Sequence, residues 1–163
     1  MKAFLFSAIM LLSSAMFAQS KADEIQITKL IDDLIAAYNS HDFTTLKNNS
    51  TDDVNWINIV GMWWKGRNEV IGAHNGIFNT IFNGVKFDKK SVSMRSVTDD
   101  VMLANVIIHV GEFFPPDGVD RGTNKQKAAD DIITLVYVKK GGKWLLTAGQ
   151  NTVIDANAVP PKR

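Results

Sequence analysis

The order of two hydrophobic periods along this chain constrains its fold more than any other feature. Apolar residues recur every three or four positions over residues 27–38 and 68–82, which predicts two amphipathic helices. Between them, residues 54–59 and 62–65 predict a short hairpin that reverses at Gly61. From residue 85 onward the pattern favours long strands, 85–97 with 101–114 and 132–139 with 143–153, the second pair joined at Gly141–Gly142.

Helices first, long antiparallel strands last and one helix inserted after a hairpin predict an α+β fold. Helices would cover one face of a strongly curved, mainly antiparallel sheet, and the bent strands would enclose a conical hollow. Short polar segments supply the breaks between elements. Asp42 can cap a short helix, 51–53 is expected to be a turn, Gly84 closes the second long helix and 115–122 is a polar loop.

Residues 1–20 have the pattern of a secretory signal peptide. Lys2 gives a basic start, residues 3–17 are apolar apart from three serines, and small residues follow. Because the apolar run is short for a membrane span, an uncleaved anchor is the lesser alternative. Cleavage after Ala18 and cleavage after Ser20 both stay open. We therefore expect one domain over 21–157, a flexible tail over 158–163, no membrane span after cleavage, and a periplasmic or secreted bacterial location.

The composition excludes several classes of protein. A formal net charge of +1 argues against nucleic-acid binding. The absence of cysteine rules out thiol catalysis, thiolate zinc sites and iron–sulfur clusters, and export without disulfides favours a bacterial periplasm. The three histidines are far apart in sequence, with no His-x-x-x-His spacing, and no Gly-x-Gly-x-x-Gly follows a predicted strand. We therefore expect neither a metal nor a cofactor.

A histidine interrupts the apolar face of the second long helix. That face consists of Val70, Ile71, His74, Ile77, Phe78, Ile81 and Phe82. An imidazole in such a position needs a hydrogen-bonding partner or a cavity. The tryptophan-bearing hairpin directly precedes this helix, so a small pocket between them would let His74 act as a general base or acid. The alternative is a structural histidine that a backbone carbonyl satisfies.

Other side chains are candidates for the wall of this pocket. Trp63 and Trp64 are adjacent on a strand, so they must point to opposite faces and at most one can join the pocket. His109 lies either in the hollow, where it would meet His74, or on the outer face of the sheet. Buried amides could bind a carbonyl or satisfy the backbone. The predicted ligand-binding residues are Trp56, Asn58, Trp64, His109 and Gln150, with His74 as the catalytic candidate.

Several segments resemble a known family. Residues 58–67 (NIVGMWWKGR), followed by the helix with His74, resemble the SgcJ/EcaC-type branch of the SnoaL-like proteins, within the nuclear transport factor 2-like superfamily. Residues 39–42, and 144 with 150–152, are also similar. The resemblance implies a cone of helices wrapped by a curved sheet. It implies a fold more firmly than a function, since the superfamily includes isomerases, cyclases, dehydratases and noncatalytic assembly domains.

Tyr38 occupies a place broadly similar to that of an oxyanion-hole tyrosine in isomerases of this superfamily, although the expected pair of apolar-embedded carboxylates is missing from the sequence pattern. We predict a protein that binds a small, largely apolar molecule and transfers a proton on a carbonyl substrate, with Asn58 or Gln150 polarising the carbonyl. The competing predictions are a noncatalytic carrier and an assembly domain. The exposed face of the sheet is expected to support a homodimer.

Overall fold

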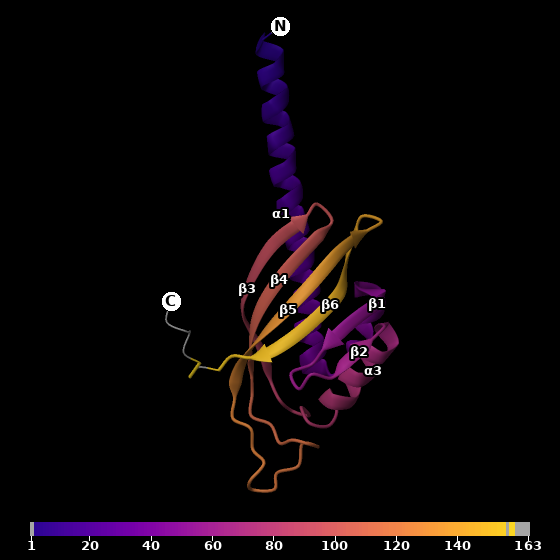
Figure 1. The fold of residues 1–163 in the computed structure, drawn as a ribbon, viewed down its shortest axis with the longest axis vertical. Helices are drawn as coiled ribbons and strands as arrows, with labels where there is room; N and C mark the ends of the chain where they lie inside the picture. The colour runs from indigo at the N-terminus through magenta and orange to yellow at the C-terminus, as the bar shows by residue number, and fades with distance from the viewer. Residues whose placement is uncertain (1, 156, 159–163) are drawn as a thin grey trace.

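A long helix lies across one face of a curved six-stranded sheet in the computed structural model (Figure 1), which describes residues 2–155 and 157–158, with side chains from residue 21 onward. The elements, in chain order, are α1 (Lys2–Ser40), the 3-10 helix η1 (Phe43–Thr45), α2 (Leu46–Asn49), β1 (Ser50–Ile57), β2 (Trp63–Lys65), α3 (Arg67–Phe78), β3 (Phe87–Thr98), β4 (Val101–Val110), β5 (Ala129–Lys140) and β6 (Lys143–Val153).

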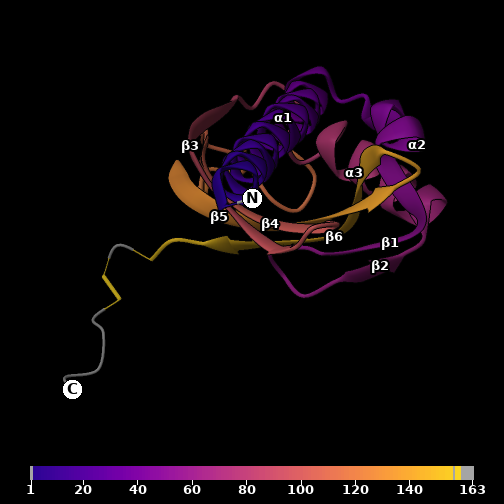
Figure 2. The ribbon, with the colours of Figure 1, turned by 90° about the horizontal axis from the view of Figure 1, so that it is seen from above.

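The strands are arranged in the order β2-β1-β6-β5-β4-β3, and the neighbours pair antiparallel except β1 and β6, which are parallel. The sheet bends around α1, with α2 and α3 beside that helix (Figure 2). The predicted α+β fold, with helices on a strongly curved and mainly antiparallel sheet, is confirmed.

The apolar face of α1 forms the centre of the core. Ile27, Ile31, Leu34 and Tyr38 recur at helical spacing and are all buried against the concave face of the sheet. Asp23, one turn earlier, is also buried. Its Oδ1 accepts hydrogen bonds from Trp144 Nε1 (2.9 Å) and Lys139 Nζ (2.7 Å), which ties α1 to the hairpin between β5 and β6.

Several predicted boundaries are wrong. Residues 51–53, expected as a turn, belong to β1, because Ser50 already pairs with Leu146 of β6. The helix predicted over 68–82 is α3, which ends at Phe78, and turns replace the last predicted segment. Residues 111–114 leave the sheet after β4, and β5 begins earlier than expected, at Ala129. The cap at Asp42 is confirmed, since its Oδ1 accepts a hydrogen bond from Thr44 N (2.9 Å).

The two predicted terminal segments are only partly described. Helix α1 begins at Lys2 and continues without a break through the predicted cleavage region, so the signal peptide stays a prediction. Residues 159–163 of the predicted tail lie outside the described residues. Among the helices whose side chains are described, none has the length and apolar character needed to cross a membrane.

Candidate functional site

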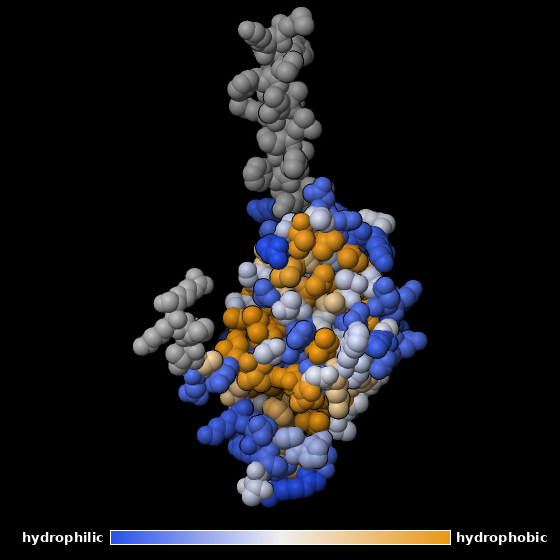
Figure 3. Space-filling view, in the orientation of Figure 1, coloured by the Kyte–Doolittle hydropathy of each residue, from blue (hydrophilic) through white to orange (hydrophobic). Residues whose placement is uncertain are grey.

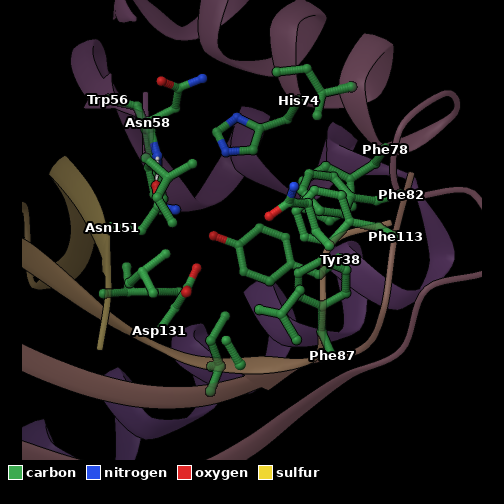
Figure 4. Close-up of a pocket in the computed structure, with 18 of the residues that line it drawn as sticks. Tyr38, Trp56, Asn58, His74, Phe78, Phe82, Phe87, Phe113, Asp131 and Asn151 are labelled. Carbon is green, nitrogen blue, oxygen red and sulfur yellow. Dashed lines mark hydrogen bonds between the residues drawn. The ribbon is translucent and has the colours of Figure 1, made fainter. Parts of the chain in front are cut away.

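A cavity of about 190 Å³ lies between α1, α3, the β1–β2 hairpin and the concave face of the sheet (Figure 4). Its walls are mostly apolar. A cavity of about 150 Å³ suffices for benzene, so this one has room for a molecule with a single ring. The lining side chains are Tyr38, Trp56, Asn58, Ile59, Trp64, His74, Ile77, Phe78, Phe82, Phe87, Ile108, Val110, Phe113, Gln126, Lys127, Ala129, Asp131, Ile133, Asn151 and Val153.

Four phenylalanines from separate elements form one wall of the cavity. Phe78 stacks on Tyr38, with ring centroids 5.0 Å apart and an interplanar angle of 8°, and Phe87 lies 5.0 Å from Phe78. Phe82 contacts Phe113 at 4.7 Å. These contacts join α1, α3, β3 and the segment after β4 into a continuous aromatic surface against which a flat apolar ligand would pack.

His74 is buried at the edge of the cavity, and its ring centroid lies 6.2 Å from that of Phe78 (Figure 4). Its Nδ1 lies 2.8 Å from the Val70 carbonyl oxygen. Because a carbonyl only accepts, Nδ1 donates, which leaves Nε2 as an acceptor beside the cavity. The ring packs edge-on against Trp56 and Trp64, at centroid distances of 4.9 and 5.0 Å. Burial among these rings lowers the pKa of His74 to about 4, so the imidazole is neutral at pH 7.

A polar cluster lies at the wall of the cavity that β1, β5 and β6 form. Trp56 Nε1 donates to Asn151 Oδ1 (3.3 Å), and the Asn151 side chain also hydrogen-bonds Asp131. Burial raises the pKa of the Asp131 carboxyl, against the opposing effect of that hydrogen bond. The Tyr38 hydroxyl points toward Asp131 (Figure 4). Burial, with smaller contributions from Tyr137 and Asp131, raises the pKa of Tyr38, so the phenol stays protonated and can donate a hydrogen bond to a ligand.

The sequence profile of the SnoaL-like domain matches residues 27–153. The chain belongs to this family. The match covers the described core from the start of the buried face of α1 to the end of β6. No curated protein matches the chain.

Solved structures share the fold of this SnoaL-like domain. An uncharacterized protein with a cystatin-like fold from Caulobacter vibrioides aligns with a TM-score of 0.76 and 28% identity, over 82% of this chain and 91% of its own. A nuclear transport factor 2-like protein from Salmonella enterica gives 0.70 and 13%, over 88% and 99%. A hexachlorocyclohexane dehydrochlorinase, LinA type 2, gives 0.69 and 15%, over 88% and 97%. The predicted nuclear transport factor 2-like fold is therefore confirmed.

Four of the six predicted site residues of the SnoaL-like domain line the cavity: Trp56, Asn58, Trp64 and His74. The two adjacent tryptophans do point to opposite faces. Trp64 is buried, whereas Trp63 is 56% exposed and donates its Nε1 hydrogen bond to Asn55. Asn58 lies just after β1, and its Oδ1 accepts hydrogen bonds from the backbone N–H groups of residues 60 and 62, so only its amide nitrogen remains for a ligand.

The prediction that His109 lines the cavity is wrong. In β4 the buried residues alternate from Met102 to Val110, so Ile108 and Val110 face the cavity and His109 faces outward. There its Nδ1 lies 2.7 Å from Asp130 Oδ1, and Lys90 contacts the other oxygen of the same carboxylate at 2.9 Å. The sequence could not decide which face of the sheet His109 occupies, because β4 is mostly apolar on both faces.

The prediction that Gln150 lines the cavity is also wrong, because Gln150 is exposed on the outer face of the sheet. Tyr137 of β5 pairs with Leu146 of β6, but the next pair is Val136 with Ala148, so Thr147 is an extra residue. This bulge moves the inward positions of β6 from even to odd numbers. As a result Asn151, not Gln150, faces the cavity.

Asp131 and Lys127 are the site residues that sequence reasoning missed. Asp131 lies one residue before the predicted strand 132–139, although its spacing of two from Ile133 places both on one strand face. The same spacing continues back through Ala129 to Lys127, and all four line the cavity. Within the part of the chain whose side chains are described, no cluster of three or more histidine, aspartate or glutamate residues could hold a metal ion.

Proposed function

We propose that this SnoaL-like domain binds a small, largely apolar molecule in the cavity and transfers a proton on a carbonyl group of that molecule. The observation that carries the proposal is the cavity itself, an apolar chamber lined by a neutral imidazole and by a phenol beside a carboxyl. Its size suits a single ring. A structural neighbour of the same fold is named a hexachlorocyclohexane dehydrochlorinase, which indicates that such a fold can act on a small cyclic molecule.

The proton transfer follows from the protonation states of His74 and Tyr38. Neutral His74 has its lone pair on Nε2, where it can take a proton from the carbon next to the carbonyl. The electron pair of the broken C–H bond forms the C=C bond of an enolate while the π pair of the carbonyl moves to oxygen, and the Tyr38 hydroxyl donates a hydrogen bond to that oxygen. The imidazolium then returns its proton to carbon.

Two further proposals concern the setting of the domain. Residues 1–20 would direct export to the periplasm or the exterior, as their composition indicates. The outer face of the sheet would pair two copies, because partly exposed apolar side chains such as Leu103, Ile107, Ile132 and Val136 gather there (Figure 3). Light scattering of the purified domain tests the second proposal, and Val136→Glu should convert a dimer to a monomer.

Ligand binding is tested first, by native mass spectrometry of protein purified without denaturation. We expect a bound small molecule that is released on unfolding. The control is Ala129→Phe, which fills the cavity from β5 and should remove the ligand while the circular dichroism spectrum is unchanged. A ligand retained equally by this variant would place it outside the cavity and contradict the proposal.

Catalysis is tested by NMR, as deuterium exchange at the carbons beside the carbonyl of cyclohexanone in D₂O. We expect the wild-type protein to accelerate exchange, His74→Gln to abolish the acceleration, and Tyr38→Phe to reduce it by about 10²-fold. Binding without acceleration in the wild-type protein would favour a noncatalytic carrier. Acceleration that survives His74→Gln would exclude His74 as the base. An assembly domain would show neither a ligand nor exchange.

A further inference from the structure

Strand β5 and the segment just before it present every second side chain to the cavity. Lys127, Ala129, Asp131 and Ile133 all line it, two residues apart, from the exposed end of the segment before β5 to the buried interior. In an extended segment the Cα atoms of Lys127 and Asp131 are about 13 Å apart. The lysine side chain can cover roughly half of that distance, which leaves a span that suits a ring with a short side chain.

Lys127 differs from the other cations of its loop. Lys125 forms an ion pair with Glu112, and Arg121 forms one with Asp117. Within the described part of the chain, no carboxylate lies within ion-pair distance of Lys127. It is also the only lysine or arginine among the described residues that line the cavity. The mouth of an apolar chamber therefore carries an ammonium group without a carboxylate partner.

The interior offers no comparable place for an anion. His74 is neutral there, and Asp131 would repel a second negative charge whenever it is ionised. Phe82 and Phe113 are in contact and line the same cavity as Lys127. An amphipathic ligand would gain most with its apolar body against the phenylalanines and its negative group outside, against the lysine.

We infer that the ligand of this cavity is a small carboxylic acid with an apolar, carbonyl-bearing body the size of a single ring, its carboxylate at Lys127 and its body against the phenylalanine wall. This inference rests on the proposed function and names the chemical class of its ligand. It makes Lys127 a specificity-determining residue, outside the proton-transfer machinery.

Isothermal titration calorimetry with three probes of one shape tests the inference: 3-phenylpropanoate, 3-phenylpropanamide and 3-phenylpropylamine. At low ionic strength we expect the acid to bind about three- to fivefold more tightly than the amide, as for an ion pair that solvent reaches, and the amine to bind most weakly. Added salt should reduce the preference for the acid, because it screens an exposed charge.

Variants of the two neighbouring lysines separate a local contact from general charge. Lys127→Gln should make the acid and the amide bind equally, whereas Lys127→Arg should keep the preference. Lys125→Gln is the matched control, since it removes an exposed lysine of the same loop that does not line the cavity, and it should keep the preference too.

The outcomes distinguish this inference from the proposed function. Equal binding of acid and amide to the wild-type protein, tightest binding of the amine, or an equal loss in Lys127→Gln and Lys125→Gln would overturn the inference while binding in the cavity stands. Failure of all three probes to bind, together with a co-purified ligand that Ala129→Phe retains, would overturn both.

Discussion

Protonation of His74 should couple the stability of this SnoaL-like domain to pH. In the folded state its pKa is about 4, because the ring is desolvated among aromatic side chains, whereas an unfolded histidine titrates near its ordinary value of 6.5. The unfolded chain therefore binds a proton between these two values that the folded chain does not. The free energy of unfolding that neutral His74 contributes is fully present above pH 6.5. It is lost as the pH falls toward 4 and does not change further below that.

The size of the effect follows from the two pKa values. Each unit of difference corresponds to about 1.4 kcal/mol, so the full effect is about 3 kcal/mol and the part already lost at pH 5 is about 2 kcal/mol. This is a large fraction of the stability of a typical small domain, roughly 5–15 kcal/mol.

Urea denaturation at pH 7.5 and pH 5, followed by circular dichroism, measures the change in the free energy of unfolding. Carboxyl groups also titrate over this interval, so the quantity of interest is the change in the wild-type protein minus the change in His74→Gln. We expect about 2 kcal/mol for that difference. Equal pH dependence in the wild-type protein and His74→Gln would refute the desolvation argument.

Other substitutions test how the core positions the cavity. Gly149→Ala should cost about 1–3 kcal/mol and shift tryptophan fluorescence, because its Cβ would lie 2.2 Å from atoms of the Trp56 ring; unchanged emission would contradict this contact. Asp23→Ala should lower the free energy of unfolding by about 2 kcal/mol or more in urea denaturation, because it removes the acceptor for Trp144 and Lys139. A loss below about 0.5 kcal/mol, the size that is ordinary for a surface substitution, would show that this contact is dispensable. Ile31→Ala, at a fully buried position of α1, should cost about 3 kcal/mol in the same assay, and a loss as small as that of a surface change would contradict the packing of α1 on the sheet.

Helix periodicity placed the most informative side chains correctly. The spacing that predicted the α3 stripe also predicted that His74 points into the interior, and it does. Likewise the strict alternation along a strand required Trp63 and Trp64 to face opposite ways. These predictions succeed because a helix or strand imposes its period locally, whatever its neighbours are.

The sheet shows where local reasoning ends. The two faces of β4 are both apolar, so only the packing of α1 on one of them decides that His109 faces outward. The bulge at Thr147 is a property of the pairing between β5 and β6, and because of it Asn151 rather than Gln150 faces the cavity. Residues 51–53 are polar enough for a turn, yet they continue β1 between Ser50 and Asn55, both of which pair with β6 in parallel.

The sequence by itself determined the order of the elements, the inward faces of the helices and the aromatic character of the site, because these depend on spacing along one segment. Only the tertiary structure decided which polar groups share the cavity. Tyr38, His74 and Asp131 come from three distant segments, and their meeting depends on the register and curvature of the sheet. Those quantities arise from contacts between segments, which no single stretch of sequence contains.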